Sequence, residues 1–174
     1  MKTQFESKLI ELGFSYQSNP DDFYILRPNN IIARTLRVQL ICSEAFDERK
    51  YGSNNGNEIE SIGLFKFKFN PAENESDFIT FAFQNSIKHQ IEFIIISTDE
   101  LNQRLTNENR TRNGNHTHKI VFWLMPDGFI YNCTNISIEG EWYYLSKGVN
   151  ARMADKTEWN YTEFLNDWDR LKRI

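Results

Sequence analysis

Apolar and polar side chains alternate along residues 65–69, within a stretch that begins at Ile62. The apolar positions include three phenylalanines and the polar positions two lysines, so that Phe65, Phe67 and Phe69 alternate with Lys66 and Lys68. Because alternate residues of a strand point to opposite faces, this stretch predicts a strand with one buried and one solvated face. Apolar runs follow at 78–84 and 91–97, and the last is unbroken enough to indicate a strand covered on both faces. We therefore predict three consecutive strands that pair as a meander.

The start of the chain carries an apolar stripe at helical spacing. Phe5, Leu9 and Leu12 form the stripe, and Gly13 follows where a glycine commonly ends a helix. We expect a helix of about three turns here. Turn residues at 19–21 and 28–30 then bound two predicted strands, at 23–26 and 31–42.

Two later stretches also predict helices. Ser97 and Glu100 form a capping box after the meander, so a helix of about two turns should begin there. Near the end of the chain, Asn160 and Glu163 resemble a helix start. The apolar residues of the 164–171 stretch recur at every third or fourth position, which predicts a closing amphipathic helix.

The sequence also predicts a second hairpin, between these two helices, and two polar loops. Residues 119–125 and 129–133 should pair across a Pro-Asp-Gly turn, and residues 139–147 are a candidate for one more strand. The stretches at about 44–61 and 106–118 have no apolar period and predict mobile loops. His116 and His118 in the second loop have no accompanying Cys or carboxylate set, so we expect solvated side chains rather than a metal site.

These elements predict an α/β (α+β) fold in which residues 1–174 form a single domain. Its centre should be a mixed sheet of about five to seven strands, flanked by an N-terminal, a middle and a C-terminal helix. Hydrophobic residues make up 40% of the 174, including 14 phenylalanines, which is enough to fill such a core.

Charge, hydropathy and cysteine content restrict the partners and the cellular location that we expect for the protein. The formal charge is −4 and the pI about 5.5, which disfavours nonspecific adhesion to nucleic acid or anionic lipid but leaves room for a local basic patch. No apolar run approaches the roughly 18 residues of a membrane span. The first residues lack the apolar core of a signal peptide, and Cys42 and Cys133 are no disulfide framework. A cytoplasmic location is the resulting expectation.

The order of the predicted elements resembles that of the restriction-endonuclease-like, or PD-(D/E)xK, superfamily of nucleases and their inactive relatives. Four stretches carry the resemblance: the helix FESKLIELGF, the turn Pro20-Asp21-Asp22, the strand RVQLI from Arg37 to Ile41, and the closing YTEFLNDWDRL. Together they span nearly the whole chain.

In that superfamily an acidic residue and a second acidic or glutamine residue bind magnesium, and a lysine two positions later helps to activate water. By position, the resemblance makes Asp21 or Asp22 the first ligand and Gln39 the second. Ile41 stands where the lysine is expected. The resemblance therefore implies a degenerate member without a cofactor.

A lysine on a neighbouring strand replaces the missing one in some members of the superfamily, and Lys66 or Lys68 would be the candidate here. In that alternative the protein is an active magnesium-dependent nuclease. The ordinary structural interpretation stays open beside it: the aspartates serve as turn acceptors, Gln39 is an exposed strand residue and the lysines form a solvated strand face.

Three functional hypotheses follow. The first is a non-catalytic binding protein that acts on nucleic acid or on a nucleoprotein or nuclease partner, as an inhibitor in phage or bacterial defence would. Its phosphate contacts would come from four cations if these share a face: Arg34, Arg37, Lys66 and Lys68. The second is the magnesium-dependent nuclease. The third is a plain protein–protein module anchored by exposed aromatics, for which the candidates are Trp142, Tyr143, Tyr144 and Trp159.

Overall fold

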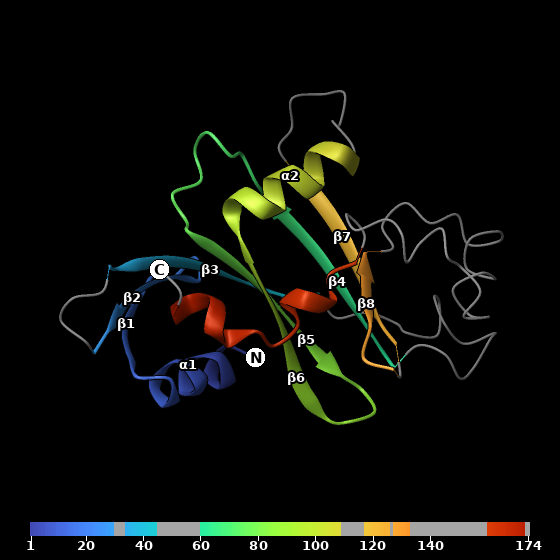
Figure 1. Cartoon of the computed structure of the whole chain (residues 1–174), viewed down its shortest axis with the longest axis horizontal. Coiled ribbons are helices and arrows are strands. Elements are labelled where there is room, and N and C mark those ends of the chain that lie inside the picture. Colours follow the sequence, from blue (N-terminus) through green and yellow to red (C-terminus); the bar gives the residue numbers. More distant parts are fainter. Residues whose placement is uncertain (30–33, 45–59, 109–116, 126, 133–159, 173–174) are drawn as a thin grey trace.

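The computed structural model describes residues 1–29, 34–44, 60–108, 117–125, 127–132 and 160–172, and these form two β-sheets with helices around them (Figure 1). The first sheet has the strand order β1-β2-β3-β5-β6. Its strands are β1 (Phe14–Ser18), β2 (Phe23–Pro28), β3 (Leu36–Cys42), β5 (Phe78–Asn85) and β6 (Gln90–Ser97). Only β3 and β5 pair in parallel, so the sheet is mixed, as predicted.

The second sheet has three strands in the order β4-β7-β8, and all its pairs are antiparallel. Its strands are β4 (Ser61–Lys68), β7 (Thr117–Leu124) and β8 (Ile130–Asn132). The helical elements are α1 (Lys2–Glu11), α2 (Thr98–Glu108) and the 3-10 segments η2 (Thr162–Phe164) and η3 (Trp168–Lys172). The predicted α+β class is confirmed.

The predicted three-strand meander is correct in its second pairing, because β5 and β6 are antiparallel neighbours, and wrong in its first. All three strands form, but β4 pairs with β7 rather than with β5. The period of two correctly placed the phenylalanines of β4 on a buried face and its lysines on an exposed face. The buried phenylalanine face of β4 packs onto a face of β5, and β4 does not pair with an edge of β5. The period of an isolated strand does not distinguish these two arrangements.

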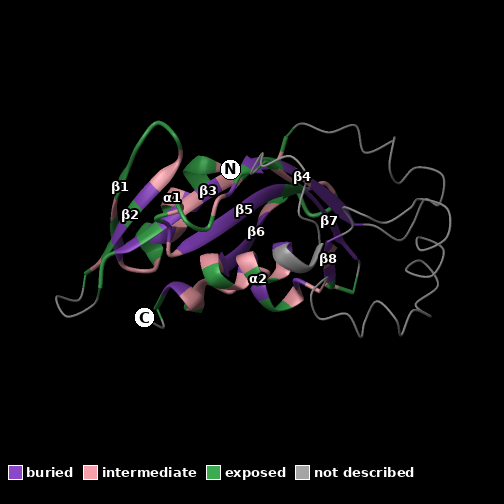
Figure 2. Ribbon diagram, turned by 90° about the horizontal axis from the view of Figure 1, so that it is seen from above, coloured by how far each residue is buried: buried purple, intermediate pink, exposed green. Residues whose placement is uncertain are grey.

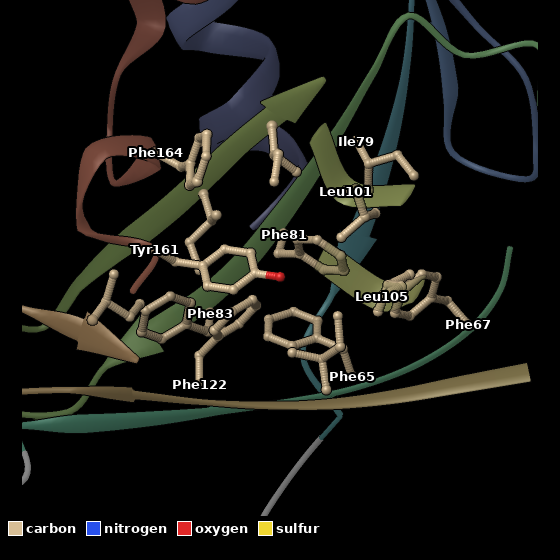
Figure 3. Close-up of a cluster of buried hydrophobic side chains, with 14 of the residues drawn as sticks. Phe65, Phe67, Ile79, Phe81, Phe83, Leu101, Leu105, Phe122, Tyr161 and Phe164 are labelled. Atoms are coloured by element: carbon tan, nitrogen blue, oxygen red, sulfur yellow. The ribbon is translucent and has the colours of Figure 1, made fainter. Parts of the chain in front are cut away.

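Phenylalanine rings fill the space between the two sheets (Figure 3). Phe81 of β5 is the centre of this layer, with its ring centroid 5.0 Å from Phe65 of β4 and 5.6 Å from Phe122 of β7. The sheets come so close at Gly63 that a Cβ added there would lie 3.1 Å from the Cβ of Phe83. A residue without a side chain is therefore needed at this crossing.

A second core lies on the opposite face of the first sheet, beneath α1. Phe5 and Leu9 of α1 are fully buried there against strand residues such as Tyr24 and Val38. The predicted N-terminal helix is confirmed, including its end near Gly13, whose φ of +83° favours glycine. With cores on both faces, β5 and β6 are the most buried strands of the molecule (Figure 2).

Three other predicted boundaries need correction. The sequence pattern missed β1, because its five residues contain only two apolar positions on the α1 face. Strand β3 begins at Leu36 rather than at residue 31. Helix α2 has 11 residues, so it reaches further than the two turns expected from its apolar pair. Its capping box is confirmed, since the Glu100 amide donates to Ser97 Oγ over 3.2 Å and the Ser97 amide donates to Glu100 Oε2 over 3.3 Å.

The closing amphipathic helix does not form as one helix. Instead, η2 and η3 are separated by extended Leu165 and by Asn166, which has a φ of +53°. Leu165 bridges to Ile94 at the edge of β6, and Asn166 accepts a bond from the Phe93 amide through Oδ1 over 3.0 Å. Pairing with the sheet edge thus replaces the helical bonds that the apolar spacing predicted.

Hairpin β7–β8 is confirmed over the described residues. Most of the predicted loops at 44–61 and 106–118, and the candidate strand at 139–147, lie outside the described residues. No helix in the described ranges combines the length and the apolar character that crossing a membrane requires.

A buried polar cluster ties the β5–β6 turn to the second sheet and to the C-terminal segment. Asn85 donates through Nδ2 to Glu60 over 2.5 Å and to Glu92 over 3.0 Å. Lys88 pairs with Glu60 over 2.7 Å, and Asn166 Nδ2 donates to Glu92 over 2.6 Å. Burial by itself would raise the pKa of Glu60, but hydrogen bonds from Lys88 and Asn85 and the charge of Lys88 hold that pKa below its usual value.

The aromatic layer gives the first testable expectation. Phe81→Ala should lower the free energy of unfolding by about 3–5 kcal/mol, because it removes a fully buried ring from the centre of the layer. Urea denaturation would measure the change. Ile87→Ala is the matched control, since Ile87 is 65% exposed and its truncation should cost under about 0.5 kcal/mol. A near-neutral Phe81→Ala variant would contradict this arrangement of the sheets.

The Glu60 cluster gives the second expectation. A carboxyl whose folded pKa is lowered contributes stability above its unfolded pKa of about 4.3, and this contribution is lost as the pH falls through the folded value. The parent should therefore be more stable than Glu60→Gln at neutral pH, and the difference should shrink as the pH falls below about 4. Denaturation at several pH values tests this, with the exposed Glu73→Gln as control. A pH-independent difference would be the contrary result.

Candidate binding cleft

Among the described residues, the core between the two sheets includes residues of β5 and β6 but none of β1 or β2, and from β3 only Ile41 packs against it. On the side that faces the second sheet, β1, β2 and the first half of β3 therefore have no described layer over them. Leu36, Val38 and Leu40 of β3 belong to the core under α1, so the alternate residues Arg37 and Gln39 point to the opposite, open side. Strand register places Gln17, Ile25 and Arg37 in one row across β1, β2 and β3. This row forms the floor of a cleft.

The cleft has a volume of about 850 Å³. Its floor comes from the first three strands and its wall from the end of β4, the start of β7 and the turn at residues 70–76. The residues that line it are Gln17, Ser18, Asn19, Phe23, Tyr24, Ile25, Arg37, Gln39, Lys68, Asn70, Glu73, Asn74, Glu75, Ser76 and Thr117. The cleft is therefore assembled from segments far apart in the sequence.

Asparagine side chains shape the turn that forms the wall. Asn70 accepts a bond from the Ala72 amide over 3.2 Å, and Asn74 accepts one from the Ser76 amide over 2.8 Å. Tight turns are stabilised when the amide of one residue donates in this way to the side-chain oxygen of an asparagine two residues earlier. Asp77 then fixes the wall to the floor, because its Oδ2 accepts a bond from the Arg37 amide over 2.7 Å.

Ion pairs neutralise most of the cations that surround the cleft. Arg37 pairs with Glu75, and Arg34 pairs with Asp77 over 2.7 Å. Lys68 and Glu73, which both line the cleft, make no ion pair with any described residue. The described lining thus presents one unpaired charge of each sign.

A hydroxyl group in the wall also lacks a partner. Ser76 is only 6% exposed, and within the described ranges its Oγ makes no hydrogen bond. Its amide donates to Asn74 and its carbonyl accepts from Thr98 Oγ1, so only the hydroxyl is left over. A buried hydroxyl without a partner is unfavourable, and a bound polar group could satisfy it.

The structure brings three of the sequence-derived candidates together. Arg37, Gln39 and Lys68 all line the cleft. Arg34 lies outside the lining and is engaged with Asp77, while Lys66 lies outside it and pairs with Glu44 over 3.0 Å. The four cations were expected to contact phosphates from one shared face, but β3 and β4 belong to different sheets, and of the four only Arg37 and Lys68 line the cleft.

The two aspartates proposed as metal ligands do not line the cleft that Gln39 lines, although the Asp22 carbonyl accepts a bond from the Leu40 amide over 2.9 Å. Asp22 pairs with Lys2 of α1 over 2.6 Å, so its carboxylate is held toward the α1 face of the sheet, whereas Gln39 points into the cleft on the other face. Asp21 is exposed and outside the lining. Within the described ranges, no group of three His, Cys, Asp or Glu side chains could hold a metal ion. These residues do not fit a two-ligand magnesium site.

Sequence reasoning missed the apolar floor and most of the wall. Ile25 is 39% exposed although it sits mid-strand, and only the register with Arg37 places it in the cleft. The stretch 70–76 contains asparagines, which favour turns, but nothing in their order indicates that this turn stands beside β3. The aromatic candidates Trp142, Tyr143, Tyr144 and Trp159, as well as His116, lie outside the described residues.

Comparison with protein-family models, with curated proteins and with solved structures found no match to this chain. Function is therefore inferred from the geometry of the cleft.

The separation of Asp22 from Gln39 has a measurable consequence. Magnesium chloride at millimolar concentration should leave the thermal midpoint unchanged within about 1 °C, relative to potassium chloride of equal ionic strength, because a ligand that does not bind the native state does not stabilise it. The Asp21→Ala, Asp22→Ala variant should behave alike. A magnesium-specific rise in the parent that disappears in this variant would mean that the ligands do assemble.

Proposed function

We propose that this protein is a non-catalytic binding protein whose cleft holds a polypeptide segment of a partner protein. The observation that carries the proposal is the balanced chemistry of the lining. Its two cations, Arg37 and Lys68, are matched by two carboxylates, Glu73 and Glu75. A polypeptide offers side chains of both signs together with an uncharged backbone, and so suits such a surface.

The uncharged lining supports the same occupant. Five side-chain amides line the cleft, and each carries N–H donors that suit the carbonyl groups of a peptide, although the Oδ1 atoms of the three asparagines already accept bonds from backbone amides of this chain. The five side chains are Gln17, Asn19, Gln39, Asn70 and Asn74. Phe23 and Ile25 also line the cleft, and they provide an apolar surface against which one side chain of the occupant can pack.

Nucleic acid is a poorer fit to this lining. Affinity for nucleic acid depends on cations that neutralise phosphates, and the carboxylate of Glu75 already occupies Arg37. Glu73 would repel a phosphate backbone, as would the overall formal charge of −4. The hypothesis of a protein-directed binder is therefore preferred over direct nucleic-acid binding.

The resemblance to nuclease-like proteins suggests one setting for this activity. A partner in phage or bacterial defence, such as a nuclease that is inhibited by occupation, would be a protein encountered in the cytoplasm. The proposal for the cleft does not depend on that setting, because it specifies only that the occupant is a polypeptide.

Selection from a random peptide library tests the proposal. The full chain serves as bait for displayed peptides of about ten residues, and enriched peptides are then synthesised and titrated by fluorescence anisotropy. Ile25→Asp should weaken their binding about 10-fold or more, because it places a charge on the apolar floor. Ile87→Asp is the matched control: Ile87 is 65% exposed and outside the cleft, so affinity should not change.

Two results would count against the proposal. One is the absence of any peptide enriched on the parent over Ile25→Asp. The other is salt-dependent binding of single-stranded DNA or RNA oligonucleotides that Lys68→Glu abolishes, which would make nucleic acid the occupant. Thermal midpoints of all variants serve as the fold control.

A further inference from the structure

Each of the two sheets has two edges, and among the described residues other segments of the chain form hydrogen bonds with three of these four edges. At β6, the Asn166 amide donates to the Phe93 carbonyl over 2.6 Å and Leu165 bridges to Ile94. At β4, the Glu44 amide donates to the Leu64 carbonyl over 2.9 Å, and the Leu64 amide donates to Ser43 Oγ over 3.0 Å. Other parts of the chain therefore bond to these two edges at Phe93 and at Leu64.

The edge of β8 is covered in the same way. The Tyr161 amide donates to the Ile130 carbonyl over 2.9 Å, and the Ile130 amide donates to Thr162 Oγ1 over 3.0 Å. Asn160 forms a bridge with Tyr131 beside them. The C-terminal segment therefore covers the outer edges of β6 and β8.

The edge of β1 differs, because its outward groups have no partner among the described residues. The Asn29 amide donates to the Gly13 carbonyl and the Asn19 amide to the Phe23 carbonyl, which fixes the odd-numbered residues as the ones bonded to β2. Tyr16 and Ser18 therefore direct their N–H and C=O groups away from β2. No hydrogen bond of the described ranges reaches these groups.

The sequence of β1 contains none of the usual protections of an open edge. Natural proteins place proline, inward charges or bulges on such strands to prevent pairing with other chains. The five residues FSYQS have no charge and no proline, and their register with β2 is continuous without a bulge. An edge of this kind is suited to pairing with one more strand.

The open edge is continuous with the cleft. Gln17, Ser18 and the following Asn19 all line the cleft, and Gln17 stands in the same row as Ile25 and Arg37. A strand added to β1 would therefore extend the floor of the cleft by one strand. β1 and β2 also lie at the end of the molecule remote from the second sheet, where exposed residues are frequent (Figure 2).

We infer that the partner segment binds as an extended strand added to the edge of β1, with alternate side chains directed over the cleft. The inference rests on the proposed function, since it specifies how the polypeptide occupant is held. Backbone bonds to Tyr16 and Ser18 supply affinity that is independent of sequence. Side chains on the cleft side meet Gln17 and the floor, whereas those on the other side lie near Tyr16, so specificity follows a period of two.

Backbone N-methylation of a selected peptide provides the test. Each N-methyl group removes one N–H donor and adds bulk at that amide, and a scan along the peptide measures the loss at every position. Affinity for the parent should fall about 10-fold or more at every second residue and change little at the residues between. A loss with no alternation, or no loss at any position, would overturn strand addition.

Ser18→Pro provides the matching change in the protein. It removes an outward N–H, a site at which an edge strand tolerates proline, so the thermal midpoint should change little while peptide affinity falls about 10-fold. Ser15→Ala is the control, because it leaves every backbone group of β1 in place. If Ser18→Pro does not fold, the N-methyl scan decides alone.

The outcomes separate this inference from the proposed function. Peptides that depend on Ile25 but show no alternation would leave the cleft as the site and overturn strand addition. Peptides that alternate but ignore Ile25→Asp would support strand addition and overturn the cleft as the main contact. Dimerisation of the parent in sedimentation experiments, abolished by Ser18→Pro, would make a second copy the occupant and overturn the partner segment.

Discussion

The packing of phenylalanine rings between the two sheets is the interaction on which the rest of the structure depends. Phe81 lies at its centre, with Phe65, Phe67 and Phe122 at centroid distances of 5.0–5.6 Å and mostly edge-on orientations. Such pairs stabilise a core beyond the burial of their area. Because these rings come from β4, β5 and β7, the second sheet is held over the β5–β6 half of the first sheet, and the floor residues of β1–β3 are left without a covering layer.

The C-terminal segment completes this arrangement. Arg170 pairs with Glu100 over 2.9 Å, and Arg104 donates to the Asn160 carbonyl over 2.8 Å. The guanidinium groups of Arg104 and Arg170 also lie 4.6 Å and 4.3 Å from the ring centroid of Phe164. Burial would raise the pKa of Glu100, but hydrogen bonds from Ser97 and Arg170 hold it below its usual value. The capping group of α2 therefore also anchors the segment that covers two sheet edges.

Local patterns in the sequence specified most elements but not their partners. The alternation in β4, the stripe of α1 and the capping box at Ser97 were each correct, because they depend on neighbours within a few residues. The pairing of β4 with β7 was not predictable from them, since many strands satisfy the same period. The closing helix failed for a related reason: the apolar spacing of Phe164 to Leu171 suits a helix, yet pairing with β6 competes with it at Leu165 and Asn166.

The same limit applied to the candidate site. Arg37, Gln39 and Lys68 were chosen for their chemistry, and the structure places them around one cleft. The ligand set of Asp22 and Gln39 could not be judged from the sequence, because the ion pair with Lys2 that draws Asp22 to the other face depends on where α1 docks. The place of Ile25 in the cleft follows from the register of β2 with β3, and the place of the wall at 70–76 follows from the folded structure; neither could be inferred from the sequence.

The cleft and the bare edge of β1 form one continuous surface, and the central claim is that a polypeptide binds there. Amide hydrogen exchange of the full chain, with and without a saturating selected peptide, tests this most directly. Exchange at Tyr16 and Ser18 should slow on binding, while exchange in β8 should stay the same, because no residue of that strand lines the cleft. Protection confined to β8, with no change at Tyr16 and Ser18, would contradict binding at this surface.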